Sequence, residues 1–215
     1  DATFSYDEDD TTIRNISFHV DVGESVAFVG PTGAGKTTVI NLISRFYDLD
    51  SGTILLDGHP INRIKRSNLR RHMAFVLQDS FLFEGTVWEN IRYGRLDATN
   101  EEVEEAAKMA NAHSFIRKLP GGYDFRLKQD GSGISQGQKQ LLSIARAVLA
   151  NPTILVLDEA TSSIDTITEM KIQEALQRLM EGRTSFVIAH RLNTIQSADQ
   201  ILVLKEGEII EKGSH

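Results

Sequence analysis

The chain has 215 residues, the length of one domain or of two closely joined domains. Its formal net charge of -7 argues against a general nucleic-acid binder, because such proteins usually carry a basic surface. The sequence contains no Cys, which excludes a disulfide framework and cysteine-ligated zinc, and no apolar run approaches the roughly 20 residues that span a bilayer. We therefore expect a soluble, mildly acidic domain suited to a reducing compartment.

Short apolar runs alternate along the chain with longer stretches of helical periodicity, a pattern typical of α/β proteins. These runs predict strands at residues 16–20, 25–29, 54–56, 73–77, 154–157, 185–189, 201–204 and 208–210. Residues 36–46 predict a helix soon after the second of these strands. The last two runs flank Glu206 and Gly207, which predicts a terminal hairpin.

Residues 79–151 are mostly helical in character, and we interpret them as a subdomain inserted into an α/β core. Thr99 and Glu102 have the spacing of a capping box at the start of one helix, and Ser135 lies near the start of another. Three apolar stripes with helical spacing predict core-facing surfaces, at Val103, Ala106, Ala107 and Ala110, at Leu141, Ile144, Ala145 and Val148, and at Ile172, Leu176 and Leu179.

A glycine-rich loop lies between the apolar run 25–29 and the helical stretch that follows, and it fits the pattern G-x-x-x-x-G-K-[ST]. The glycines of such a loop let backbone N–H groups surround phosphate oxygens, and the helix N-terminus adds a positive dipole. We expect the Lys36 ammonium to bind the β- and γ-phosphates and the Thr37 hydroxyl to bind Mg²⁺. The candidate nucleotide-binding residues here are Gly30, Pro31, Thr32, Gly33, Ala34, Gly35, Lys36, Thr37 and Thr38.

Two acidic residues, Asp158 and Glu159, follow the apolar run 154–157. In a protein with a phosphate loop, a carboxylate at a strand end can hold the water shell of Mg²⁺, which is the role we expect for Asp158. Glu159 can act on a water that attacks the γ-phosphate, as a general base or by positioning it. Because a pair of acids can also be the solvated start of a loop, both assignments depend on the phosphate loop upstream.

His190 and Gln78 follow two further predicted strands. Ligands of parallel sheets bind at the carboxyl ends of strands, so His190 would share an edge with Glu159 and contact the γ-phosphate. By the same reasoning, Gln78 is a neutral ligand for magnesium or for a water. The alternatives are that His190 is a structural residue and that Gln78 is an ordinary surface residue.

Residues 134–138 read ISQGQ and open an amphipathic helix, and they resemble the signature motif of ATP-binding cassette (ABC) proteins, usually written LSGGQ. From Phe4 to His215 the chain resembles the nucleotide-binding domain of an ABC transporter. Residues 76–94 and 157–169 look most like exporter-type members. The family's motifs occur in the family's order: the A-loop aromatic at Tyr6, Walker A at 30–37, the Q-loop at Gln78, the signature at 134–138, Walker B at 154–159, the D-loop at Ser162–Asp165 and the switch histidine at His190.

The resemblance implies an α/β fold that has a P-loop NTPase core with a parallel sheet, an antiparallel β subdomain and the inserted helical subdomain. Residues 1–215 would form a single ABC nucleotide-binding domain. Its ATP-binding core would comprise residues 1–78 and 152–215, and residues 79–151 would carry the signature. The chain starts at the A-loop strand and stops where relatives often continue, so we expect a domain excised from a longer transporter.

The same resemblance implies ATP binding and Mg²⁺-dependent hydrolysis that drive dimerisation and substrate export by a membrane ABC transporter. Tyr6 would stack on adenine, with a gain of roughly 1–3 kcal/mol if stacking in nucleic-acid sites is a guide. Two cassettes, identical or different, would close head-to-tail around two ATP molecules. Ser135, Gly137 and Gln138 belong to the signature that would then reach the partner's nucleotide, and Asp165 would link the two sites.

The implied partners are a second ABC nucleotide-binding domain and a transmembrane domain that contacts residues 81–92, with no nucleic acid. The implied location is the cytoplasmic face of the cell membrane, the implied cofactors are ATP and Mg²⁺, and the implied metal ligands are Thr37, Gln78 and Asp158. Apolar residues occur in the region that would meet the membrane domain, although they equally fit the core of a helical subdomain: Phe81, Leu82, Phe83 and Trp88.

Three positions depart from the family pattern. Gln136 stands where the signature usually has Gly, Ile134 replaces its Leu, and Gln129 stands where exporters often have Glu. Because Ser135 and Gly137 are retained, the resemblance still implies a working signature.

Two other functions fit the same motifs. A soluble ABC ATPase acting on nucleic acid or ribosomes is disfavoured by the acidic charge and by the absence of long coiled-coil insertions. A non-catalytic regulatory cassette is disfavoured because Glu159 and His190 both match the family pattern.

Overall fold

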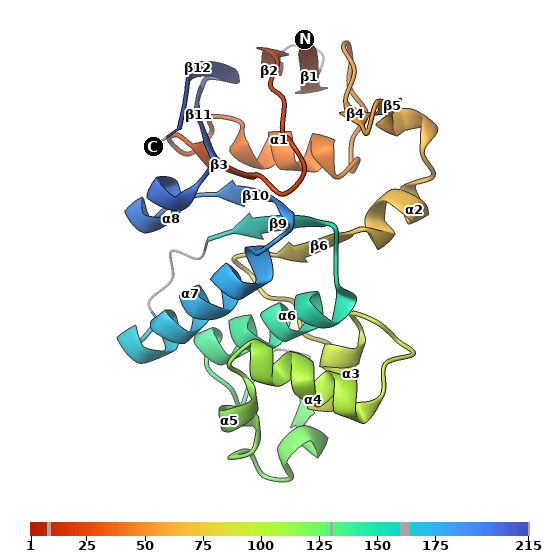
Figure 1. Cartoon of the computed structure of the whole chain (residues 1–215), viewed down its shortest axis with the longest axis vertical. Coiled ribbons are helices and arrows are strands. Elements are labelled where there is room, and N and C mark those ends of the chain that lie inside the picture. The colour runs from red at the N-terminus through yellow and green to blue at the C-terminus, as the bar shows by residue number, and fades with distance from the viewer. Residues whose placement is uncertain (8–9, 130, 160–163, 215) are drawn as a thin grey trace. The chain divides into compact units, whose positions relative to one another are not determined.

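The structure, a computed structural model, describes residues 1–7, 10–129, 131–159 and 164–214 (Figure 1). The chain divides into two compact units. The first unit comprises residues 1–73, 153–159 and 183–215, and the second comprises residues 74–152 and 160–182. Among the described residues, no helix is both long enough and apolar enough to cross a membrane.

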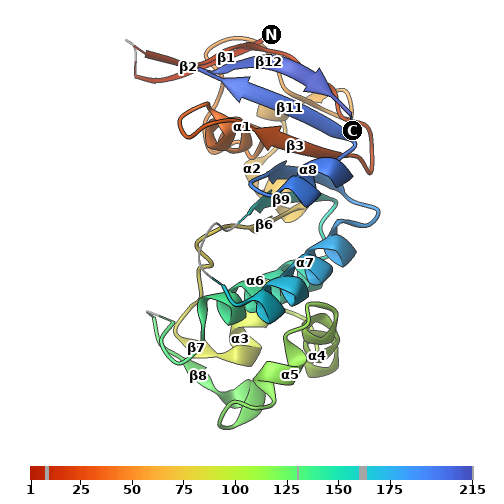
Figure 2. The same ribbon diagram turned by 90° about the vertical axis from the view of Figure 1, so that its left-hand side faces the viewer.

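A six-stranded sheet with the order β12-β11-β3-β10-β9-β6 organises the first unit. The neighbours β11, β3, β10 and β9 are parallel, whereas β12 is antiparallel to β11 and forms the predicted terminal hairpin with it (Figure 2). Five of the strands lie in the first unit, and the sixth begins there at Met73. The strands are β3 (Ser25–Val29), β6 (Met73–Val76), β9 (Ile154–Asp158), β10 (Thr184–Ile188), β11 (Gln200–Lys205) and β12 (Glu208–Gly213).

The central strands are apolar along almost their whole length because helices and loops cover both faces of a parallel sheet. Val26, Ala27 and Phe28 of β3 have no exposed surface, and Leu155 and Val156 of β9 have none either. Since β3, β10 and β9 run in the same direction, their carboxyl ends meet at one edge of the sheet (Figure 1). Side chains that follow these three strands are therefore brought together.

Smaller elements complete the first unit. Strands β1 (Ala2–Asp7) and β2 (Asp10–Ile16) form a separate antiparallel pair. Strands β4 (Leu55–Leu56) and β5 (His59–Pro60) form a short hairpin. The helices of this unit are α1 (Lys36–Ile43), α2 (Arg66–Arg71) and α8 (Leu192–Ser197), with a 3₁₀ turn, η1 (Ile61–Arg63).

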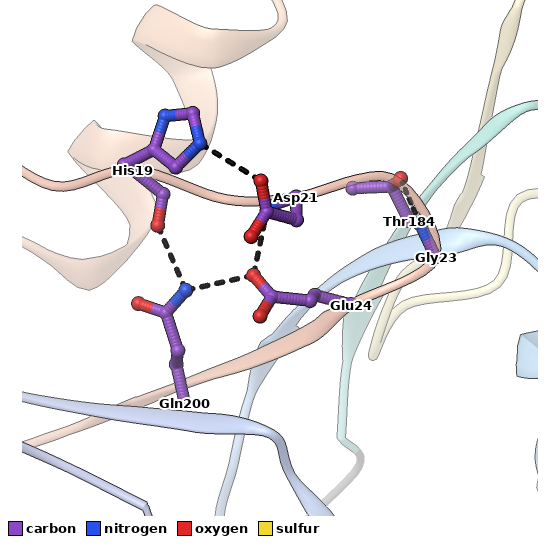
Figure 3. Close-up of polar contacts among 6 residues, drawn as sticks. All are labelled: His19, Asp21, Gly23, Glu24, Thr184 and Gln200. Carbon is purple, nitrogen blue, oxygen red and sulfur yellow. Dashed lines mark hydrogen bonds and ion pairs between the residues drawn. The ribbon is translucent and has the colours of Figure 1, made fainter.

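The strand predicted at residues 16–20 is wrong, because β2 ends at Ile16. The alternation of apolar and polar residues there comes from a connecting segment that is held by side chains instead of a strand ladder (Figure 3). Gln200 Nε2 donates to the His19 carbonyl at 2.7 Å and to Glu24 Oε2 at 2.9 Å. The Gln200 side chain therefore supplies the hydrogen bond to the His19 carbonyl that a neighbouring strand would otherwise supply.

The second unit is mostly helical, as predicted for residues 79–151. Its two longest helices, α6 (Gln136–Ala150) and α7 (Thr166–Met180), run side by side in Figures 1 and 2. The remaining elements are β7 (Gly85–Thr86), α3 (Val87–Arg92), α4 (Asn100–Met109), α5 (His113–Ile116), η2 (Gly122–Asp124) and β8 (Arg126–Leu127).

The helix starts of the second unit follow their sequence signals. The predicted capping box at Thr99 and Glu102 is confirmed at the start of α4. Ser135 is the N-cap of α6 and forms a capping box with Gln138. The three predicted apolar stripes face the interior for the most part, since all but Val148 of their residues are buried. Thr86 and Glu89 form one more capping box, at the start of α3, that the sequence reasoning did not identify.

Candidate functional site

The loop of residues 30–37, here called the phosphate loop, connects β3 to α1. Lys36 is only 9% exposed, and its Nζ donates to the carbonyls of Gly30 and, at 3.4 Å, Pro31. The ammonium therefore lies against the loop's own backbone, at the N-terminus of α1. Thr37 is exposed and its neighbour Thr38 is buried, so the Thr37 hydroxyl is the accessible one.

Two glycines of the phosphate loop stand where a side chain would not fit. A Cβ on Gly30 would lie 2.2 Å from the Leu204 carbonyl oxygen, and a Cβ on Gly35 would lie 2.8 Å from Ile13 Cδ1. Gly35 is also the N-cap of α1, with a φ of 105° that residues with side chains rarely adopt. Close packing against the Leu204 backbone and the Ile13 side chain therefore calls for glycine at both positions.

Tyr6 contacts α1, the helix that follows the phosphate loop. Its hydroxyl donates to Thr38 Oγ1 at 3.2 Å and accepts from Asn41 Nδ2 at 3.3 Å. The Tyr6 ring meets Phe4 and Tyr47 edge-on, at centroid distances of 4.9 and 5.1 Å. Tyr6 as a whole is 45% exposed, so it presents an aromatic surface that a base can stack on. Sequence reasoning missed Asn41 and Tyr47, because neither carries a motif.

Asp158, Glu159 and His190 are brought together at the carboxyl ends of β9 and β10. Ile188, the last residue of β10, is in register with Asp158. His190 Nε2 lies 3.7 Å from Asp158 Oδ1. Glu159 is only 5% exposed, and its Oε2 accepts the backbone N–H of His190 at 2.8 Å. The prediction that these three residues share one edge of the sheet is therefore confirmed.

The Glu159 carboxylate has two further partners that the sequence did not indicate. The backbone N–H of Arg191 donates to Oε2 at 3.0 Å, and the Thr194 hydroxyl donates to Oε1. Both donors lie at the start of α8. The sequence carries no signal for the contact between Thr194 and Glu159, because that contact depends on how β9 and β10 pair.

In the second unit, the signature residues lie at the N-terminus of α6. Ser135 is exposed, its backbone N–H donates to Gln138 Oε1 at 2.9 Å, and its hydroxyl accepts the Gln138 N–H at 3.2 Å. Gly137 is buried, and a Cβ placed on it would lie 2.5 Å from Thr168 Cγ2 of α7. A packing requirement within the chain therefore also calls for glycine at this position.

Two other predicted residues belong to the second unit. Gln78 follows β6 and is half-buried. Asp165 is the N-cap of α7, and the backbone N–H of Thr168 that it accepts at 2.9 Å lowers the pKa of its carboxyl below the ordinary value. Ser162, the first residue of the predicted D-loop, lies outside the described residues.

The segment 81–92 has a fixed shape with one exposed aromatic side chain. Phe81 is 65% exposed and Leu82 is buried. The buried Asn90 side chain accepts the Phe83 N–H at 2.8 Å and donates to the carbonyls of Phe83 and Thr86 at 3.0 Å each. The apolar residues of this segment are thus split between the core of the second unit and its surface.

A sequence profile described as ABC transporter matches residues 13–162, which is more than half of the chain. The chain belongs to the ABC transporter family. The uncharacterized ABC transporter ATP-binding protein YfiC of Bacillus subtilis strain 168 is 68% identical over 215 residues, which are 100% of this chain and 36% of that protein. The ATP-dependent lipid A-core flippase of Syntrophus aciditrophicus strain SB is 54% identical over 99% of this chain and 35% of its own length.

A solved structure of a bacterial Atm1-family ABC exporter with ATP bound aligns with a TM-score of 0.92 and 45% identity, covering 100% of this chain and 37% of that chain. This likeness confirms the predicted α/β fold with a P-loop NTPase core. The chain spans about a third of the length of the curated relatives it matches.

The donor groups of the first unit fit a magnesium nucleotide. The Lys36 ammonium and the helix N-terminus favour phosphate, and the oxygens of Thr37 and Asp158 are of the type that Mg²⁺ prefers. Within the described ranges, no cluster of three or more His, Cys, Asp or Glu residues could hold a metal by itself.

Proposed function

We propose that this chain is the ATP-binding and ATP-hydrolysing cassette of a membrane exporter. The observation that carries the proposal is the buried Lys36 ammonium on the phosphate loop, which follows β3 of the same sheet whose edge gathers Asp158, Glu159 and His190. Residues 1–78 and 152–215 form the ATP-binding core in this proposal, and residues 79–151 form the helical subdomain. The family membership and the ATP-bound exporter of similar fold support it.

The phosphate loop binds the triphosphate in this proposal. Lys36 moves its ammonium from the loop carbonyls to the β- and γ-phosphates, while backbone N–H groups of residues 32–38 surround the phosphate oxygens. Tyr6 stacks on the adenine ring, which its partly exposed face allows. Thr37, Asp158 and Gln78 hold Mg²⁺, either directly or through water.

Hydrolysis requires a water in line with the γ-phosphate and a group that orients it. Glu159 has this role in the proposal, as a general base or by positioning the water. His190 contacts the γ-phosphate and stabilises its developing charge, and Gln78 contributes from the Q-loop. Bound Mg²⁺ would neutralise charge on the β- and γ-phosphate oxygens.

The complete site in this proposal needs a second cassette, identical or different, that supplies its own Ser135, Gly137, Gln138 and Asp165. The exposed N-terminus of α6 offers N–H groups and a positive dipole to that partner's nucleotide. A transmembrane domain contacts residues 81–92, and the assembly lies at the cytoplasmic face of the membrane. Relatives of this chain that include ATP-binding/permease proteins and a flippase support these partners.

Replacing Glu159 with Gln tests the catalytic assignment. The amide oxygen of Gln can accept the N–H groups of His190 and Arg191, and its NH₂ can donate to the Thr194 hydroxyl, so the fold is expected to persist. We expect turnover of ATP to be lost, ATP binding to remain and a dimer to appear on gel filtration only with Mg-ATP. The matched control is the same change at the exposed Glu101 of α4, which leaves turnover intact. Undiminished hydrolysis by Glu159→Gln would refute the role of Glu159.

A further inference from the structure

Glu159 is held by three donors of one short segment, at residues 190–194. We propose that Thr194 is a positioning residue for Glu159, which sets the direction in which this carboxylate can act on water. The inference rests on the proposed function, because it concerns the same reaction. It assigns a role to a residue outside the predicted motifs.

The two carboxylate oxygens of Glu159 are held in different ways. Oε2 accepts two backbone N–H groups, those of His190 and Arg191, which occupy both of its lone-pair directions. Oε1 accepts only the Thr194 hydroxyl, and no other described residue donates to it. One lone pair of Oε1 is therefore left for a water, so Oε1 is the oxygen that can act as base.

The Thr194 hydroxyl determines where that lone pair points. The terminal torsion of a Glu side chain is broad and has no sharp staggered wells, so a carboxylate anchored at one oxygen can still turn. With Oε2 fixed by backbone groups, a donor on Oε1 supplies the second point that stops this rotation. The burial of Glu159 strengthens the restraint, because a hydrogen bond to a charged group is stronger in a buried environment than in water.

A purely structural role for the same contacts predicts something different. If the carboxylate only capped the start of α8, loss of the Thr194 hydroxyl would lower stability and leave the kinetics of the folded protein unchanged. If Thr194 positions Glu159, loss of the Thr194 hydroxyl lowers kcat. The KM for ATP stays nearly constant, because other residues contact the phosphates and the adenine ring. Measuring both the stability and the kcat of a variant without the hydroxyl therefore separates a structural role of Thr194 from a positioning role.

The experiment compares Thr194→Val, which keeps the shape and removes the hydroxyl, with Thr194→Ser, which keeps the hydroxyl. We expect kcat to fall about tenfold or more in Thr194→Val, because small displacements of a catalytic group have effects of this order, while KM changes by less than about twofold. Thr194→Ser should retain most of the wild-type kcat. Thr53→Val, the same chemical change at an exposed coil position, should behave as wild type.

Equal kcat values for Thr194→Val and Thr194→Ser would overturn the inference. If Thr194→Val does not fold, Thr194→Ala removes the same donor and is measured against Thr194→Ser in its place. The failure of the proposed function looks different: the wild type would show no Mg-ATP turnover, or Glu159→Gln would hydrolyse ATP normally. A wild type that hydrolyses ATP, an inactive Glu159→Gln and an unaffected Thr194→Val would reject the role of Thr194 alone.

Discussion

At the scale of single residues, Asn90 shows how one buried side chain fixes a loop. Its amide makes three hydrogen bonds to the backbone of Phe83 and Thr86, and only 1% of its surface is exposed. Arg146 adds a hydrogen bond from its Nε to the Asn90 carbonyl at 3.0 Å, and burial lowers the pKa of that guanidinium. Buried polar groups therefore hold the segment 81–92 in place.

Asn90→Ala should destabilise the protein by about 1–3 kcal/mol, because it leaves backbone groups of residues 83 and 86 buried without partners. The measurement is urea unfolding monitored by circular dichroism. Asn100→Ala, at the exposed first residue of α4, is the control and should change stability by less than about 0.5 kcal/mol. Equal midpoints for the two variants would contradict the account of Asn90.

At the scale of elements, the close contact of α6 with α7 depends on Gly137. The Cβ of an Ala at this position would lie 2.5 Å from Thr168 Cγ2 and 3.0 Å from Ile164 Cγ2, so the helices must separate or Thr168 must move. Gly137→Ala should cost about 1–3 kcal/mol of stability, the usual range for overpacking. Thr168→Ser removes the offending methyl group, so the double variant should recover part of the loss in a double-mutant cycle. Strict additivity of the two changes would show that the steric explanation is wrong.

The start of α7 makes the stability of the second unit depend on pH. The N–H of Thr168 lowers the pKa of Asp165 in the folded protein, so the ionised carboxylate stabilises the fold above its ordinary pKa of 3.8. This contribution is lost as the pH falls through the lowered value. Asp165→Asn keeps a capping group and cannot titrate. The urea midpoints of wild type and Asp165→Asn should differ by a constant amount near neutrality and converge below pH ~4. A difference that widens in acid would contradict the assignment.

At the scale of the whole molecule, binding of Mg-ATP should increase the stability of the folded chain. Mg-ATP at about 100 times its Kd should raise the free energy of unfolding by about 2.7 kcal/mol, because it binds only the folded state. Lys36→Ala should abolish this increment, whereas Lys118→Ala, which removes an exposed lysine, should retain it. Thermal unfolding with and without Mg-ATP measures both. An undiminished increment in Lys36→Ala would exclude the phosphate loop as the binding site.

The sequence predicted those features that depend on local spacing. The phosphate loop, the capping box at Thr99, the helix start near Ser135 and the apolar runs of β3 and β9 all need only neighbouring residues to be recognised. The grouping of Glu159 with His190 followed from a general rule about parallel strands.

Contacts between distant segments were not predictable in this way. The Thr194 hydroxyl reaches Glu159 across 35 residues of sequence, and no local pattern encodes that meeting. The fit of Gly137 against Thr168 depends on the separation of two helices. The false strand at 16–20 has the same origin, because the Gln200 side chain that binds the His19 carbonyl comes from the far end of the chain.

The packing of the phosphate loop against the terminal hairpin has a consequence for synthesis. Gly30 fits against the Leu204 carbonyl, and the N–H of Gly207 donates to the Ala34 carbonyl at 3.0 Å. At ~5–20 residues per second, a ribosome delivers those supports roughly ten seconds or more after the loop itself. During this interval the nascent chain carries the phosphate loop without the Leu204 and Gly207 backbone that packs against it. The folded shape of the phosphate loop therefore depends on backbone from β11 and from the turn that follows it, which is synthesised long after the loop itself.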